Sequence, residues 1–222
     1  MTVQAHDERM DRQSRRERDA HGVRLAVQAD VPEMRDALVQ AFLEDPVVAW
    51  VYPDVVNRSE CLPEWYDIML TAGLRSGHTY TVTSKQAVAV WSPPAVPHMV
   101  EWERDGAAMA DMMSRHLGGR TKYVLDGLMR IETAHPHDVP HFYLAMLGTL
   151  PAAQGKGLAG ALLDDVLERC DREGWPSYLE TSRERNVHFY ERRGFRVTST
   201  MELPDDGPTI WFMWRNCQPP EV

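Results

Sequence analysis

The clearest pattern along the chain is an apolar run at 144–150 that leads through a glycine-rich turn into a long helical repeat. After the turn, apolar residues recur every three or four positions and charged residues occupy the other side, which predicts an amphipathic helix beginning near Lys156. Its apolar positions are Leu158, Leu162, Leu163, Val166, Leu167 and Cys170. The pattern therefore predicts a buried strand, a tight turn and a helix that packs on the core.

The rest of the chain alternates between strand-like and helix-like patterns. Short apolar or alternating runs bounded by Pro and Gly predict strands at 23–27, 79–83, 87–91, 177–181, 195–202 and 209–215, besides the strand that starts at 142. Helical spacing predicts a helix that Asp30 caps and that ends at 44–46, and others at 60–74, 106–117, 121–131 and 185–193.

Residues 1–20 differ from the rest, because they mix both charges with almost no apolar content. Such a segment cannot bury enough surface to offset its chain entropy, so we expect a flexible charged tail. A helical arm in an oligomer is the alternative interpretation.

The glycine-rich turn has the features of a phosphate-binding site. Gly155 and Gly157 would let the backbone approach a ligand, and the start of the following helix directs unpaired N–H groups and its positive dipole end to the same place. A pyrophosphate is the natural ligand for that arrangement.

Two well-known phosphate motifs fit this turn less well. The P-loop pattern fails, since Leu150 stands where it needs Gly and Gly157 where it needs Ser or Thr. The dinucleotide fingerprint is met by Gly155, Gly157 and Gly160, with Glu180 about 20 residues later as an acidic ribose ligand, and it stays open as the second interpretation. Against it, 151–154 separate the strand from the first glycine, and too little chain follows for a doubly wound sheet.

A third motif matches at every fixed position. Residues 154–159, Gln-Gly-Lys-Gly-Leu-Ala, fit the turn Gln/Arg-x-x-Gly-x-Gly/Ala, and a second block at 179–195 contains Asn186 and ends in Phe-Tyr-x-x-x-Gly-Phe. Both blocks, in this order and spacing, resemble the GNAT family of N-acetyltransferases. Within that family, the stretches 87–91, 142–145, 178–182, 189–192 and 211–215 are similar to the puromycin N-acetyltransferases, and the similarity is patchy before residue 140.

The resemblance implies a mixed α/β fold: a single GNAT-type acyl-CoA N-acyltransferase domain over 21–217, with a central, mostly antiparallel sheet flanked by helices. It also implies acetyl-CoA as the cosubstrate. The residues expected to bind it are Leu147, Gly148, Thr149, Gln154, Gly155, Lys156, Gly157, Leu158, Ala159, Gly160, Asn186 and Tyr190.

The resemblance also assigns catalytic roles. The strand around 146–149 is expected to separate from its neighbour, so that the N–H of Leu147 faces the thioester oxygen. Tyr190 is the expected general acid for the departing thiolate, and Glu180 is the first choice as the base that takes the proton of the amine. Glu132, His141 and Tyr143 remain alternative bases.

The expected reaction is direct transfer of acetyl to a primary amine of a small molecule, such as the antibiotic puromycin or a related amine. A polyamine, a peptide or a protein lysine are alternative acceptors, and a catalytically silent acyl-CoA-binding module is an alternative of another class. Trp50, Tyr52, Trp65 and Trp102 lie in the half of the chain that usually surrounds the acceptor, so stacking on a drug-like amine is one interpretation and plain packing the other.

Composition and charge limit which partners and which cellular location we expect for this chain. The formal net charge of -9 argues against nucleic-acid binding and favours cationic amines. Three cysteines without C-x-x-C spacing suggest neither disulfides nor a zinc site, and we expect no signal peptide, no membrane span and a cytoplasmic monomer or homodimer. The histidines of 135–141 lie in a proline-containing run that we expect to be a solvated surface loop rather than a metal site.

Overall fold

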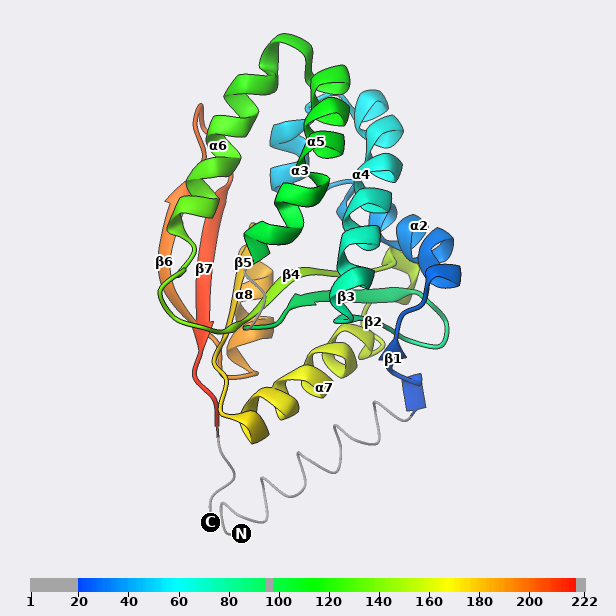
Figure 1. The fold of residues 1–222 in the computed structure, drawn as a ribbon, viewed down its shortest axis with the longest axis vertical. Helices are drawn as coiled ribbons and strands as arrows, with labels where there is room; N and C mark the ends of the chain where they lie inside the picture. The colour runs from blue at the N-terminus through cyan, green and yellow to red at the C-terminus, as the bar shows by residue number, and fades with distance from the viewer. Residues whose placement is uncertain (1–19, 95–97, 219–222) are drawn as a thin grey trace.

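In the computed structural model, which describes residues 20–94 and 98–218, seven strands form one sheet in the order β1-β2-β3-β4-β5-β7-β6 (Figure 1). Strands β4 and β5 are parallel and the other neighbouring pairs are antiparallel. The strands are β1 Arg24–Leu25, β2 Thr79–Thr81, β3 Ala87–Ser92, β4 Phe142–Thr149, β5 Ser177–Thr181, β6 Arg196–Glu202 and β7 Thr209–Arg215. The mixed α/β class and the mostly antiparallel sheet are thus confirmed.

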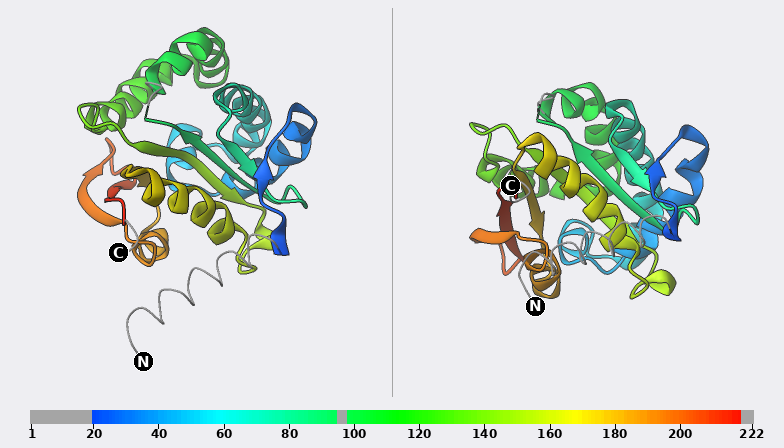
Figure 2. Two further views of the ribbon diagram at one scale, coloured as in Figure 1. Left: turned by 60° about the horizontal axis from the view of Figure 1, so that its bottom comes forward. Right: turned by 90° about the horizontal axis from the view of Figure 1, so that it is seen from below.

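Helices cover both faces of the sheet (Figure 2). They are α2 Val31–Phe42, α3 Pro46–Val51, α4 Val55–Ser76, α5 His98–Leu117, α6 Thr121–Ala134, α7 Leu158–Glu173 and α8 Glu184–Glu191, with short 3-10 turns η1 Gln28–Asp30, η2 Gly118–Arg120 and η3 Pro151–Ala153. The apolar sides of α7 and α8 pack on one face of the sheet, and α2, α4, α5 and α6 pack on the other. The sheet is therefore the middle layer between two cores.

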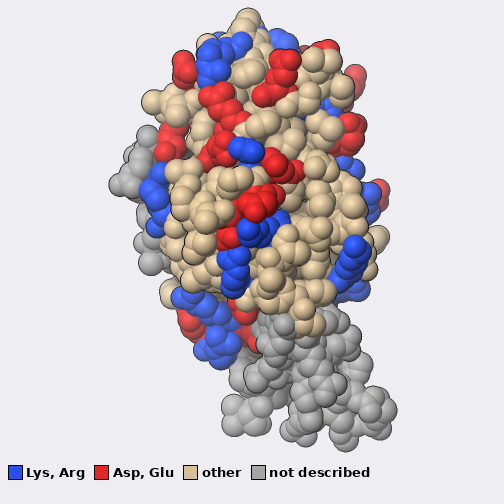
Figure 3. All heavy atoms as spheres, turned by 90° about the vertical axis from the view of Figure 1, so that its right-hand side faces the viewer, with Lys and Arg blue, Asp and Glu red and all other residues tan. Residues whose placement is uncertain are grey.

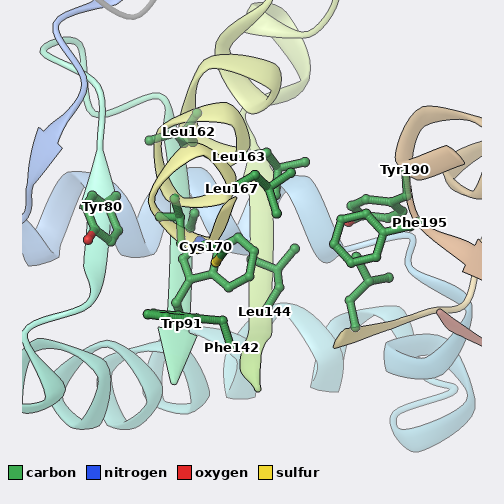
Figure 4. Close-up of a cluster of buried hydrophobic side chains, with 14 of the residues drawn as sticks. Tyr80, Trp91, Phe142, Leu144, Leu162, Leu163, Leu167, Cys170, Tyr190 and Phe195 are labelled. Atoms are coloured by element: carbon green, nitrogen blue, oxygen red, sulfur yellow. The ribbon is translucent and has the colours of Figure 1, made fainter. Parts of the chain in front are cut away.

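The core under α7 follows the periodicity of its sequence. The predicted stripe of six apolar residues is buried against Trp91, Phe142 and Leu144 of the sheet (Figure 4). The helix starts at Leu158, two residues after the expected position, because Gly157 takes a left-handed φ of 81° and becomes the N-cap. Gly174 ends it in the same way, with a φ of 78°.

The structure contains helical segments that the sequence patterns did not predict. Asp45 and Pro46 do not only end a helix: the Asp45 carboxylate accepts hydrogen bonds from the N–H groups of Val47 and Val48 and so starts α3. In the same way, Asp54 caps α4, which starts at Val55, five residues before the predicted start. Helix α6 also continues past the predicted end at 131, to Ala134.

Asp30 precedes α2 as expected but does not cap it with its side chain. The buried carboxylate instead accepts two hydrogen bonds from Arg24, at 2.6 and 2.8 Å, and one from the N–H of Val27 at 2.9 Å. Asp30 thus connects β1 to the turn before α2.

Asp30→Asn should lower the free energy of unfolding by about 2 kcal/mol near neutral pH. Hydrogen bonds from Arg24 lower the pKa of Asp30 to about 2 in the folded chain. A carboxyl group with a lowered folded pKa stabilises the fold above its unfolded pKa and loses that contribution as the pH falls through the folded pKa. Urea unfolding should therefore show a stability difference between the two proteins that narrows as the pH falls from about 4 to about 2; a difference that does not change with pH contradicts this assignment.

Charges of both signs share the molecular surface over α2 and α4 (Figure 3). Arg35 pairs with Asp67 across these two helices at 3.4 Å, and Lys85 pairs with Glu33 at 2.7 Å. On this face, acidic and basic side chains are thus intermixed, and neither sign forms a large patch of its own.

Within the described residues, no helix combines the length and the apolar character that a membrane span requires. Of the predicted charged tail, residues 1–19 lie outside the part of the chain that the structure describes.

Candidate active site

The two central strands of the sheet separate along their length. β4 pairs with β5 at Phe142, Tyr143 and Leu144, but β4 continues to Thr149 and β5 to Thr181 without further pairing between them. The separation that we expected around 146–149 is therefore present. It leaves backbone groups of β4 on its β5 side without a strand partner.

A bulge in β4 determines which groups face this gap. Trp91 pairs with Leu144 and Val90 with Met146, so Ala145 is the extra residue. Before the bulge, the N–H of Phe142 points to the β5 side, where it bonds the carbonyl of Pro176 at 2.9 Å; after it, the N–H of Leu150 points to the β3 side, where it bonds the carbonyl of Gln86 at 2.8 Å. Because backbone groups alternate along a strand, the N–H of Leu147 lies on the β5 side, within the gap.

The turn after β4 has an open backbone. Gly155 and Gly157 have φ values of 75° and 81°, and a side chain added at Gly155 would meet nothing within 4 Å. The Gln154 amide donates to the carbonyl of Thr149 at 3.2 Å and holds the turn against the strand end. Gly157 offers no side-chain cap, so the first N–H groups of α7, at Leu158, Ala159 and Gly160, have no intrahelical acceptor.

Two glycines of the predicted cofactor set have packing reasons of their own. A Cβ at Gly148 would lie 2.6 Å from Leu38 and 2.9 Å from Phe42, so this glycine lets α2 approach the sheet. A Cβ at Gly160 would lie 2.3 Å from the Arg193 guanidinium, which pairs with Asp164 at 2.7 Å. Gly155, in the turn itself, has no such neighbour, so its φ of 75° is the reason for a glycine there.

Tyr190 lies in the core between α8 and the sheet, beside Phe189 and Phe195 (Figure 4). It is 6% exposed, and burial raises its pKa above the ordinary value although Arg193 acts in the opposite direction. The phenol therefore stays protonated near neutral pH, so it has a proton that it can donate.

Asn186 lies in the first turn of α8, close to the end of β5. Its amide donates to the Thr181 hydroxyl at 3.3 Å, which makes it a link between helix and strand rather than an N-cap. The preceding loop is connected to the N-terminal half of the chain: the Ser182 hydroxyl donates to Asp45 at 2.9 Å, and Arg183 donates to the carbonyl of Glu44. The cap of α3 thus also fixes the loop between β5 and α8.

Glu180 lies on the opposite face of β5 from Leu179, the residue that packs with Tyr190. Its side chain is 12% exposed, and one carboxylate oxygen lies 3.7 Å from Nδ1 of His135. Burial raises the pKa of Tyr143 and of Tyr178, and the nearby Glu180 carboxylate raises both pKa values further. Glu180 and Tyr190 are therefore on two sides of the sheet, next to the gap between β4 and β5.

The expectation of a solvated loop at 135–141 is wrong for two of its histidines. His135 is 6% and His141 8% exposed, and their Nε2 atoms are 3.1 Å apart. Both rings pack on Tyr178, which pairs along the sheet with Tyr143. Among the described residues, no group of His, Cys, Asp and Glu side chains is arranged to hold a metal ion.

Three of the four aromatic residues that we expected near the acceptor pack, fully or in part, in the protein core. Tyr52 is 1% exposed, and the Trp50 indole donates to the carbonyl of Pro204 at 3.1 Å, so both belong to the core. Trp65 packs partly buried against the same core as Tyr52, and the side chain of Trp102 lies outside the described set.

Three residues of the cluster around Glu180 were not predicted to lie together: His135 and Tyr178 received no role, and His141 was named only as an alternative base. Residue 135 and residue 180 come together because β4 runs parallel to β5, so the end of α6 meets the adjacent strand. The only local signal is that two histidines flank a Pro-containing run that ends at the start of a buried strand.

Comparison with known proteins shows the family to which the chain belongs. The model of the acetyltransferase (GNAT) family matches residues 64–195, more than half of the sequence. An uncharacterised N-acetyltransferase of Schizosaccharomyces pombe is 26% identical over 200 residues, which cover 82% of this chain and 76% of that protein.

Solved structures agree with this match. One from Corynebacterium glutamicum, described as histone acetyltransferase HPA2 and related acetyltransferase, has 25% identity and a TM-score of 0.67 over 90% of this chain and 98% of its own. An agmatine N-acetyltransferase has the same fold, with 18% identity and a TM-score of 0.59 over 87% of this chain and 98% of its own. The chain therefore belongs to the GNAT family of acetyl-CoA-dependent N-acetyltransferases.

Proposed function

We propose that the domain at 21–217 transfers acetyl directly from acetyl-CoA to the primary amine of a small molecule, and that an antibiotic such as puromycin or a related amine is its acceptor. One observation carries this proposal. Strands β4 and β5 separate beyond Leu144, and at this end of β5 Glu180 lies on the opposite face from the core cluster that contains Leu179 and Tyr190.

The residues of the turn fit acetyl-CoA. The open backbone at Gly155 and the free first turn of α7 suit its phosphates, with Lys156 exposed beside them. The Thr149 hydroxyl is buried without a hydrogen-bond partner among the described residues, as expected of a group that awaits a ligand. In this proposal Gln154–Gly160 hold the phosphates, and β4 from Leu147 to Thr149, with Asn186 and Tyr190, holds the remainder.

The cosubstrate supplies an activated acetyl thioester, and three groups of the chain handle its reaction with the amine. The N–H of Leu147 donates to the thioester oxygen as negative charge develops there. Glu180 takes a proton from the substrate ammonium, which otherwise cannot attack. Tyr190 gives its proton to the departing thiolate as the carbon–sulfur bond breaks, and the second proton, which the nitrogen loses as the amide forms, restores the phenol.

Direct transfer is preferred over an acetyl-cysteine step. Cys170 lies on the buried stripe of α7 and is 0% exposed, and burial raises the pKa of its thiol to about 11. A thiol in this state is a poor nucleophile.

The side of the sheet that Glu180 occupies favours a cationic acceptor. Besides burial, Glu180 and Glu132 both raise the pKa of Tyr178, so two carboxylates lie near this ring. Carboxylates beside aromatic rings suit an ammonium group. The same chemistry would accept a polyamine or agmatine, the amine in the name of the second solved structure above.

An acceptor panel tests the proposal. The chain with acetyl-CoA should add one acetyl group to puromycin or another small primary amine, followed by mass spectrometry, with higher kcat/KM than for a lysine peptide. Preference for the peptide would overturn the acceptor class. Binding of acetyl-CoA without acetylation of any amine would instead indicate a silent binding module.

Gly155→Ala should weaken acetyl-CoA binding about tenfold, because the new methyl group and the strained φ disturb the phosphate turn. Gly174→Ala is the matched control, since Gly174 has a similar φ of 78° and equally open space at the other end of α7. Each substitution should cost about 1 kcal/mol of stability. Calorimetric titration should find weaker binding for Gly155→Ala alone; equal loss in both variants would mean that the turn does not contact the cofactor.

A further inference from the structure

We infer that His135, held in one tautomer by His141, receives the proton that Glu180 takes from the acceptor amine. This inference rests on the proposed role of Glu180 as the base. It makes His135 a positioning and proton-holding residue behind Glu180, and His141 the residue that orients it.

A chain of contacts determines the hydrogen positions. Nδ1 of His141 lies 2.6 Å from the carbonyl of Val139, which can only accept, so this nitrogen carries the hydrogen. The Nε2 of a neutral His141 is then an acceptor, and the Nε2 of His135, 3.1 Å away, must donate to it. In a neutral His135 ring, the remaining nitrogen, Nδ1, then carries the lone pair, and it is Nδ1 that faces Glu180.

This lone pair points at a carboxylate oxygen 3.7 Å away. Two acceptors face one another favourably only when a proton lies between them. Before the reaction the pair lies beyond hydrogen-bond distance, and catalytic hydrogen bonds are often long without substrate. A proton arriving on Glu180 would turn the contact into a hydrogen bond.

The surroundings of His135 suit a ring that becomes a cation. Tyr143 and Tyr178 lie edge-on to it, with centroids at 4.8 and 4.7 Å, and their raised pKa values keep both phenols neutral. The other titratable groups of the cluster are Glu132, His137 and His141, and Glu132 faces His137 at 3.6 Å. Trp214 of β7 covers His141.

The proton transfers balance in two steps. An N–H bond of the substrate ammonium breaks as an O–H bond forms on Glu180. That O–H bond then breaks as an N–H bond forms at Nδ1 of His135, which restores the carboxylate and leaves an imidazolium beside it. The Nε2 hydrogen stays in its bond to His141, and no further reactant is needed.

Nitrogen NMR of the histidine rings in the full chain tests the arrangement without any acceptor. The expected result is a hydrogen on Nε2 of His135 and on Nδ1 of His141. A hydrogen on Nδ1 of neutral His135 would overturn the inference, whichever amine the protein acetylates and even if it acetylates none of those tested.

Kinetics with any accepted amine test the role. His135→Ala should lower kcat about tenfold with unchanged acetyl-CoA affinity, and added imidazole should restore it while pyrazole, of similar shape but far weaker as a base, should not. His188→Gln, at an exposed histidine of α8 that pairs with Glu191 at 3.0 Å, should leave kcat unchanged. Equal rescue by both additives, or no loss in His135→Ala while Glu180→Gln is impaired, would overturn the role of His135 and leave the proposed function standing.

Discussion

Glu180→Gln should lower kcat for amine acetylation about 10²- to 10³-fold at neutral pH. The substitution keeps the shape of a side chain that is 12% exposed, so the fold is preserved, but it removes the group that accepts the proton of the ammonium. An alkyl ammonium near the lysine value of about 10.4 is almost fully protonated at neutral pH. As the pH approaches that value, free amine becomes abundant and the loss in Glu180→Gln should shrink.

Glu132→Gln is the comparison for this variant, because Glu132 lies in the same cluster, is 25% exposed and is an alternative base. Its loss should be much smaller than that of Glu180→Gln in pH profiles of kcat and kcat/KM. If Glu132→Gln carries the larger loss, the proton acceptor lies on α6 rather than on β5.

Tyr190→Phe should lower kcat about 10²-fold and change acetyl-CoA affinity little. The phenylalanine keeps the ring contacts with Phe189 and Phe195, at 5.2 and 5.9 Å, so packing is retained and only the hydroxyl is lost. Because burial raises the pKa of Tyr190, the phenol carries its proton throughout the working pH range and donates it as the carbon–sulfur bond breaks.

Tyr80→Phe is the matched control. Tyr80 is 8% exposed in the same hydrophobic cluster under α7, and its pKa is also raised by burial (Figure 4). Steady-state kinetics and acetyl-CoA titration should find this variant unchanged. Wild-type turnover in Tyr190→Phe would remove Tyr190 from the mechanism.

The elements with strong periodicity could be predicted from the sequence. Strand β4 starts at Phe142 as expected, and α7 starts within two residues of its expected position, since local patterns determine both. Helix α3 was missed because Pro46 reads equally well as the end of one helix and the first turn of another.

The side chains that surround Glu180 could not all be predicted from the sequence. Glu180 was singled out by its block, but its contact with His135 depends on the parallel pairing of β4 with β5, which brings residues 45 positions apart together. Burial of His135 and His141 likewise depends on Tyr178 and Trp214, which belong to other strands. Such neighbours leave no periodic signal in the chain.

A crystal structure of the protein with acetyl-CoA would decide whether the reaction takes place where the two strands separate. The expected result has the pyrophosphate on the backbone of Gln154–Gly160 and the thioester in the gap between β4 and β5, near the N–H of Leu147, with Tyr190 and Glu180 on either side. A cofactor bound elsewhere, or a thioester out of reach of both side chains, would contradict the proposed site.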